Sequence, residues 1–268
     1  MIAIPPRPLE AAPLEALAKL QQLVGEQGDY VAQVTYAKTS WGRKPKALFA
    51  TLKGKLAIMC SGNRRCTYCE DSLADEIEHM RPKDLYPDQA YVWENYVLAC
   101  GPCNGPKNNR FAVLDAAAEL IDVSRKPKDD VVPPVSGVHA LVNPRIEDPL
   151  ELLWLDFRTW RYVPKIDDEA SAAWKRAAYT IRVLRLNDRD ELVRGRRAAS
   201  TNFVSRLHRW IEMRTRWSDE EQQGFVADFR AERYRGVWER LKRGSQAPVE
   251  VVREVEALLT EAPEARGW

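Results

Sequence analysis

The sequence lacks an apolar run long enough to cross a membrane, and it lacks a signal peptide. No apolar run approaches the roughly 18 residues that a membrane span needs. The first residues, MIAIPPRPLEAAPLEAL, do not place a basic end before an apolar run, as a secretory signal would. These absences predict a cytoplasmic protein that acts without a membrane partner.

Internal repeats and low-complexity segments are also lacking, which argues against a solenoid and against extended disorder. The 268 residues are 45% hydrophobic and 30% charged, as in ordinary globular proteins. This length allows one large domain or two modest ones with a real core.

Histidine and cysteine are scarce, with three and five residues. An odd number of cysteines in a chain without an export signal argues against a disulfide framework. Four of them form two Cys-x-x-Cys pairs, Cys66 with Cys69 and Cys100 with Cys103. We expect the fifth, Cys60, to pack as a small hydrophobic side chain.

Two close pairs of thiolates supply the four soft ligands of a tetrahedral zinc ion. The 30 residues between the pairs exceed the usual spacer, so a folded unit must loop out between them. A four-cysteine site is coordinatively closed, so this Zn²⁺ would be structural and would contribute on the order of 10 kcal/mol to folding. The alternative is a set of reduced thiols in the core.

The spacing of apolar residues predicts helices over 13–24 and 45–59, separated by a basic loop, TSWGRKPK. EIEHM and YVLAC predict brief strands on either side of a loop with two prolines. We expect a helix to begin near Asn104.

The second half of the chain reads as a linker over 126–137, a partly extended aromatic segment, and helices from about Glu169. Capping-box patterns at Asp188/Glu191 and Ser218/Glu221 predict two helix starts, and 248–262 a last short helix. The stretch 171–243 carries 18 Lys and Arg against 10 Asp and Glu, whereas 61–115 carries 6 against 9. The basic stretch, 171–243, would suit binding of a polyanion such as nucleic acid, or its charges are solvated on helix faces. The acidic stretch, 61–115, would suit binding of a cation.

Between the cysteine pairs lie Glu78, His79 and Asn95, and Asn104 and Lys107 follow directly. A histidine with a pKa near ~6.5 is mostly neutral at cytoplasmic pH and accepts a proton from water. Carboxylate and amide oxygens are hard ligands suited to Mg²⁺ or Mn²⁺. Such a cation would bind the oxygens of a phosphodiester during hydrolysis.

The order Cys-x-x-Cys, acid-His-x-x-Pro, Asn, Cys-x-x-Cys-Asn-x-x-Lys resembles the HNH (ββα-metal) nuclease module, from about Arg65 to Arg110. In that family a β-hairpin and a helix hold one divalent cation. The resemblance implies that His79 is the general base, that Glu78 and Asn104 bind the cation, and that Asn95 holds the loop that orients the histidine. His79 as a surface histidine and Asn104 as a plain helix cap are the alternatives.

The sequence therefore predicts an α+β fold that is mainly helical. A zinc-stabilised ββα-metal core at 60–125 is expected between an N-terminal helical segment, 1–59, and a mostly helical region, 138–268. Phosphate contacts are expected from Lys107, Arg81, Lys83 and Arg65, with solvated charges as the alternative. Asp75 and Glu76 read mainly as solvent-facing.

CTYCE, IEHMRPK, WENYVLACGPCNGPK and NPRIEDPLELL together resemble one branch of the family, the PtuB-like HNH subunits of Septu-type and retron anti-phage systems. That resemblance implies an ATPase partner and a role in defence. The leading hypothesis is therefore a metal-dependent endonuclease that cuts DNA. A nuclease acting on RNA, a non-catalytic zinc-stabilised module that binds nucleic acid or a partner, and a subunit that cuts only with its ATPase are the alternatives.

Overall fold

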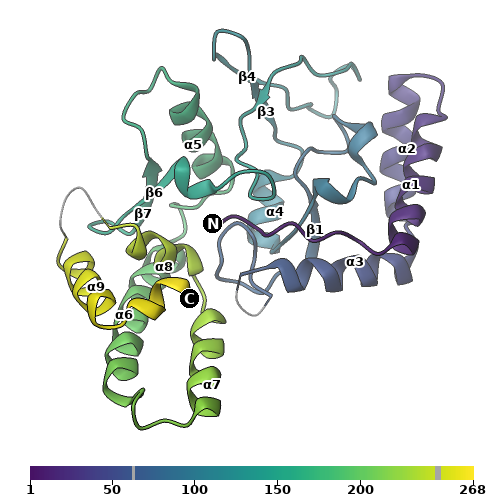
Figure 1. Cartoon of the computed structure of the whole chain (residues 1–268). Coiled ribbons are helices and arrows are strands. Elements are labelled where there is room, and N and C mark those ends of the chain that lie inside the picture. Colours follow the sequence, from purple (N-terminus) through teal and green to yellow (C-terminus); the bar gives the residue numbers. More distant parts are fainter. Residues whose placement is uncertain (62–63, 245–248) are drawn as a thin grey trace.

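The structure is a computed structural model that describes residues 1–61, 64–244 and 249–268. Helices dominate and the strands are short, so the mainly α, α+β prediction is confirmed (Figure 1). The helices are α1 (Ala11–Gly25), α2 (Tyr30–Gly42), α3 (Lys46–Met59), α4 (Gly101–Lys107), α5 (Ala172–Val183), α6 (Asp190–Met213), α7 (Asp219–Arg230), α8 (Arg235–Lys242) and α9 (Glu250–Glu261). The strands are β1 (Glu76–His79), β2 (Tyr96–Ala99), β3 (Ala112–Leu114), β4 (Leu120–Asp122), β5 (Val138–His139), β6 (Leu153–Asp156) and β7 (Arg161–Pro164).

Helices α1, α2 and α3 form an N-terminal layer beside the β1–β2 hairpin (Figure 1). The expected basic loop at TSWGRKPK is wrong in its first half, because α2 continues to Gly42 and only 43–45 connect it to α3. Helix α2 begins where the Asp29 side chain accepts a hydrogen bond of 2.8 Å from the backbone N–H of Ala32. This layer covers one side of the hairpin.

Strands β1 and β2 pair antiparallel, with Glu76 opposite Ala99 and His79 opposite Tyr96. Both strands lie where EIEHM and YVLAC predicted them. Helix α4 follows β2 at once and begins at Gly101 rather than near Asn104. A proline in its first turn explains the early start, because the missing N–H would have no partner there in any case.

The remaining strands form a three-stranded sheet of order β4–β3–β5 and a separate β6–β7 hairpin. The β6–β7 hairpin confirms the partly extended reading of the aromatic segment. The expected linker at 126–137 contains neither helix nor strand.

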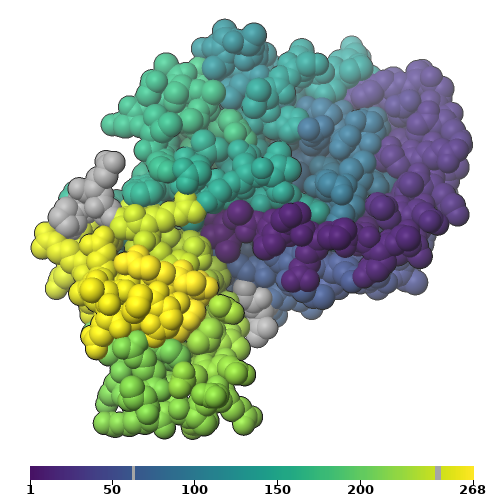
Figure 2. Space-filling view, in the orientation of Figure 1, coloured from purple at the N-terminus to yellow at the C-terminus, as the bar shows by residue number. Residues whose placement is uncertain are grey.

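Helices α6 to α9 form a lobe that projects from the rest of the molecule (Figures 1 and 2). The capping box at Ser218 and Glu221 is confirmed, with both of its hydrogen bonds present at the start of α7. The capping box at Asp188 and Glu191 is wrong, because Arg189 is the N-cap of α6. Asp188 instead lies 3.3 Å from the Arg185 guanidinium.

Buried apolar side chains form one continuous cluster that includes both the N-terminal layer and the C-terminal helices. None of the described helices combines the length and the apolar composition that a membrane span would need. The continuous core gives the β1–β2 hairpin support from both flanks.

Candidate active site

The four paired cysteines meet at the base of the hairpin. Cys66 and Cys69 lie before β1, Cys100 follows β2, and Cys103 lies in the first turn of α4. All four are buried, and their Sγ atoms lie within 4.8 Å of one another. Among the residues described, this is the one group of three or more His, Cys, Asp or Glu side chains close enough to share a metal ion.

The surroundings of these sulfurs suit thiolates bound to a cation such as Zn²⁺. The backbone N–H of Cys100 lies 3.4 Å from Cys66 Sγ, and the Arg189 guanidinium donates to Cys103 Sγ at 3.1 Å. Four thiolates around one Zn²⁺ carry a net negative charge, which a guanidinium and a backbone N–H stabilise. The position of Arg189 before α6 therefore ties the C-terminal region to this centre.

Helix α4 lies over one face of β1, and two pairs of side chains join them. Asn104 donates from Nδ2 to Glu76 at 2.6 Å. Lys107 forms an ion pair with Glu78 and also donates to the His79 carbonyl at 2.8 Å. Residues 76 and 78 share a strand face, and residues 104 and 107 are one helical turn apart, so the two pairs match.

Glu78 and Lys107 are both buried. Burial raises the pKa of Glu78 above its usual value, and the neighbouring Lys107 ammonium opposes that rise. Since Lys107 is fully buried, its ammonium does not face solvent as the expected phosphate contact requires. Its observed role is to neutralise Glu78.

Asn95 lies just before β2 and holds the loop that connects the two strands. Its Oδ1 accepts from the backbone N–H of Arg81 at 2.8 Å, and its Nδ2 donates to the carbonyls of Arg81 and Gln89 at 3.0 and 2.9 Å. The geometry therefore agrees with the loop-holding role that the family resemblance implies.

His79 is 6% exposed and lies on the face of β1 opposite Glu78. Its Nε2 lies 2.9 Å from the Ala90 carbonyl, which also accepts from the Tyr96 hydroxyl at 2.7 Å. The Trp41 ring lies against the imidazole, with centroids 4.3 Å apart. Burial, followed by the charge of Lys83, lowers the pKa of His79 to about 3, so the ring is neutral.

The structure thus brings together most, but not all, of the expected site. His79 and Glu78 are neighbours, yet Asn104 contacts Glu76 and not Glu78. Glu76 is exposed, as the sequence predicted, but its contact with Asn104 was missed. Its spacing of two residues from Glu78 places both on one strand face and was the available signal. Trp41 was also missed, because nothing in its local sequence links it to a histidine 38 positions away.

The other expected phosphate contacts lie around this site without forming one surface. The Arg65 guanidinium donates to the Asp71 carbonyl at 2.9 Å. Arg81 is half-buried near the Tyr86 ring, at 5.9 Å from its centroid. Lys83 lies 6.0 Å from the Trp41 centroid, on the side of His79.

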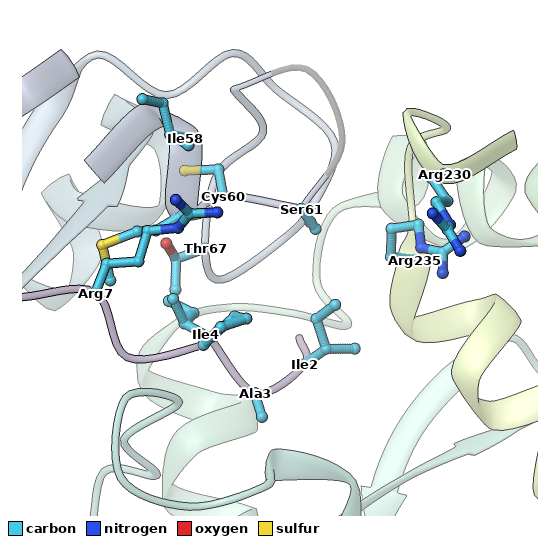
Figure 3. A pocket seen from close by; sticks show the side chains of 12 residues that line it. Ile2, Ala3, Ile4, Arg7, Ile58, Cys60, Ser61, Thr67, Arg230 and Arg235 are labelled. Carbon is cyan, nitrogen blue, oxygen red and sulfur yellow. The ribbon is translucent and has the colours of Figure 1, made fainter. Parts of the chain in front are cut away.

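A cavity of about 270 Å³ lies elsewhere, between the N-terminal segment and the C-terminal helices. Cys60 and Thr67 stand on one side of it and Arg230 and Arg235 on the other (Figure 3). Cys60 packs partly buried against the core, as expected, and burial raises the pKa of its thiol to about 11. The cavity includes none of the candidate catalytic residues.

The hairpin with four clustered cysteines at its base, the histidine at its end and the crossing helix lie in a segment that matches one known family. Residues 66–110 match the HNH endonuclease family. We refer to them below as the HNH segment. The chain is also similar to the Septu protein PtuB of Bacillus thuringiensis, with 27% identity over 164 residues, or 59% of this chain. The chain spans about half of that relative, 51% of its length. No solved structure matches the chain.

We expect Cys66→Ser to remove the bound zinc and to lower the unfolding temperature. The zinc site is worth on the order of 10 kcal/mol, and a chain of this size loses roughly 2–4 °C of Tm per kcal/mol. Removal of the zinc therefore lowers Tm by about 20 °C or more. Metal analysis and differential scanning calorimetry measure both effects. Cys60→Ser is the matched control, since Cys60 lies outside the cluster; one zinc per chain in both variants would contradict the assignment.

We expect Asn95→Ala to destabilise the fold by about 2–4 kcal/mol, because three backbone groups of the loop lose their partner. Urea unfolding measures the change. Asn202→Ala removes the same amide from the side of α6 and should cost less than about 1 kcal/mol. Equal losses in the two variants would show that Asn95 does not hold the loop.

We expect Lys107→Met to destabilise the fold by about 3–5 kcal/mol, because it leaves Glu78 buried without a counter-charge. Adding Glu78→Gln to the same chain should recover most of that loss. A double-variant cycle in urea measures the coupling. Additive effects of the two substitutions would mean that the pair does not act as a unit.

Proposed function

We propose that this protein is a metal-dependent endonuclease that hydrolyses phosphodiester bonds in DNA. His79 is the general base, and Glu78 and Asn104, with Glu76 beside them, supply ligands for Mg²⁺ or Mn²⁺. The observation that carries the proposal is the orientation of His79 at the end of a hairpin anchored by four cysteines. The match of the HNH segment to a nuclease family supports it independently.

The tautomer of His79 suits a base. A carbonyl oxygen only accepts hydrogen bonds, so the contact with Ala90 requires a proton on Nε2. Nδ1 then carries the lone pair that can take a proton from water. Asn95 and Tyr96 are positioning residues, because they fix the loop and the Ala90 carbonyl on which this tautomer depends.

The donor set beneath α4 suits a hard divalent cation. Glu76 and Glu78 provide carboxylate oxygens, and Asn104 uses its Nδ2 on Glu76, which leaves Oδ1 as a ligand. When bound, such a cation would neutralise the phosphodiester and stabilise its leaving oxygen. Lys107 balances the charge of Glu78 on the protein side.

Water attack on a phosphodiester needs no 2′-hydroxyl, so this chemistry works on DNA; RNA is the competing substrate. The proposal extends to anti-phage defence in the cytoplasm together with an ATPase partner. Its support is the similarity to the Septu protein and the motifs shared with that branch.

One observation favours a second candidate, a non-catalytic zinc-stabilised module. Glu78 already has a buried ammonium as its partner, and His79 is nearly covered. In such a module both residues would serve folding alone, and substrate cleavage would not depend on them.

Plasmid cleavage separates the two candidates. Purified protein is incubated with supercoiled plasmid, single-stranded DNA or RNA, with Mg²⁺ or Mn²⁺ and with EDTA. We expect cation-dependent cleavage of DNA and a loss of at least about 10²-fold in His79→Ala, because a general base contributes that much or more. A product gel read over time gives the rates.

His208→Ala is the matched control, since His208 is exposed on α6 and contacts only Glu254, at 3.0 Å. This variant should cleave like the parent chain. Equal cleavage by His79→Ala would remove His79 from the mechanism. Cleavage of RNA alone would mean that RNA is the substrate. If a folded, zinc-loaded chain cleaves nothing with either cation, restoration of cleavage by an ATPase partner would indicate a subunit that cuts only in the complex, and continued inactivity would favour the non-catalytic module.

A further inference from the structure

A groove of about 540 Å³ lies between the N-terminal layer and the HNH segment. One wall comes from the end of α2 and from α3, and it carries Trp41, Lys44, Lys46 and Lys53. The other wall includes Glu76 and Asn104, the two side chains that join β1 to α4. Figure 1 shows α3 running beneath the hairpin that contains β1, and α3 packs against β2.

The three lysines of this groove have no acidic partner in the described ranges 1–61, 64–244 and 249–268. Their neighbours do have partners, since Lys55 on the same helix pairs with Glu10, and Lys38 on α2 lies 3.0 Å from Asp84. Lys44 donates to the Trp41 carbonyl at 3.3 Å and lies over the Trp41 and Phe49 rings, 4.7 and 5.7 Å from their centroids. Three uncompensated positive charges therefore line one wall of the groove.

The spacing of these lysines suits a chain of phosphates. Lys46 and Lys53 are seven residues apart on α3, so they share a face and are separated by about 10 Å along its axis. Successive phosphates of one B-DNA strand advance by about 3.4 Å along the duplex axis. Along a parallel duplex axis, the lysine wall thus spans roughly three phosphate steps. The opposite wall holds the oxygens proposed to bind the cation.

The groove comes near the proposed base through one side chain, although His79 itself is not part of its lining. Trp41 belongs to its wall and lies directly against His79. A strand held by the lysines would bring a phosphodiester between the Glu76–Asn104 pair and the Trp41–His79 pair. Both walls of the groove suit an anionic substrate. One wall carries the three lysines, and the other would carry the divalent ion.

We propose that Lys44, Lys46 and Lys53 bind the phosphates of a DNA strand and guide it to the site formed by the HNH segment. This inference rests on the proposed nuclease function and assigns substrate binding to the N-terminal layer, outside residues 66–110. The contacts are to phosphates, so they carry no sequence preference. Their strength depends on salt, because each neutralised phosphate releases counterions.

The test measures binding apart from cleavage. A labelled DNA duplex is titrated with His79→Ala protein, in which cleavage is blocked, and with the same protein carrying Lys44→Gln, Lys46→Gln and Lys53→Gln. We expect the three substitutions to raise Kd at least about tenfold and to reduce the slope of log K against log salt by about 3, roughly 0.9 for each lysine. Zinc content and Tm should not change.

Two controls match the change in charge. Lys19→Gln, Lys126→Gln and Lys128→Gln together remove three exposed lysines elsewhere and should leave Kd within about twofold. Lys44→Arg, Lys46→Arg and Lys53→Arg keep the charge and should keep most of the affinity. An equal loss in the control triple, or no loss in the groove triple, would overturn the inference. So would a loss of affinity for an RNA duplex without one for DNA.

The outcomes for the groove and for the nuclease function are separable. If the chain cleaves plasmid in a His79-dependent way, but the three lysine substitutions change neither DNA binding in the His79→Ala chain nor cleavage in the parent chain, the function stands and the groove assignment fails. If no cleavage occurs even with an ATPase partner added, but DNA binding depends on the three lysines, the groove assignment stands and the nuclease function fails.

Discussion

Four buried sulfurs hold together a hairpin that is too short to persist alone. Strands β1 and β2 have four residues each, and an isolated two-stranded hairpin is marginal in water even when longer. Cys66 and Cys69 lie where the chain enters this unit, and Cys100 and Cys103 lie where it leaves. A metal ion bound to all four would close the unit at one point and fix α4 against β1. The side chains proposed for catalysis lie within that closed unit, and so do the residues proposed to position them.

The features of this unit that depend on residues close together in the chain could be predicted from the sequence. The cysteine pairs and the strand at EIEH follow from spacing and local pattern, because the residues that make them lie within one short segment. The loop-holding role of Asn95 was implied by the family resemblance of the same segment. The expected partners of side chains were less reliable. Asn104 contacts Glu76 instead of Glu78, and Lys107 is buried; both depend on how α4 crosses β1, which no local pattern specifies. The capping box at Asp188 failed for a similar reason, since Arg189 contacts a distant sulfur.

Electrostatics inside the HNH segment are balanced before any cation binds. A carboxylate as buried as Glu78 would be costly alone, and Lys107 supplies the opposite charge at contact distance. The same ammonium also contacts the His79 carbonyl, so one side chain joins the acid, the base and α4. Buried ion pairs add little net stability but favour one arrangement over others. Here they would favour the arrangement in which Glu78 and His79 are neighbours on opposite faces of β1.

The HNH segment is too small to build its own core, and its flanks complete it in different ways. On one side Arg189 donates to a cysteine sulfur, which links the C-terminal helices to the four-cysteine cluster. On the other side Trp41 covers His79, which is buried deeply enough to keep its ring neutral. An imidazole at the end of an isolated hairpin would be solvated and would titrate near its ordinary pKa of about 6.5. The N-terminal layer therefore helps to set the protonation state of the proposed base, through Trp41, and also supplies the lysines of the neighbouring groove.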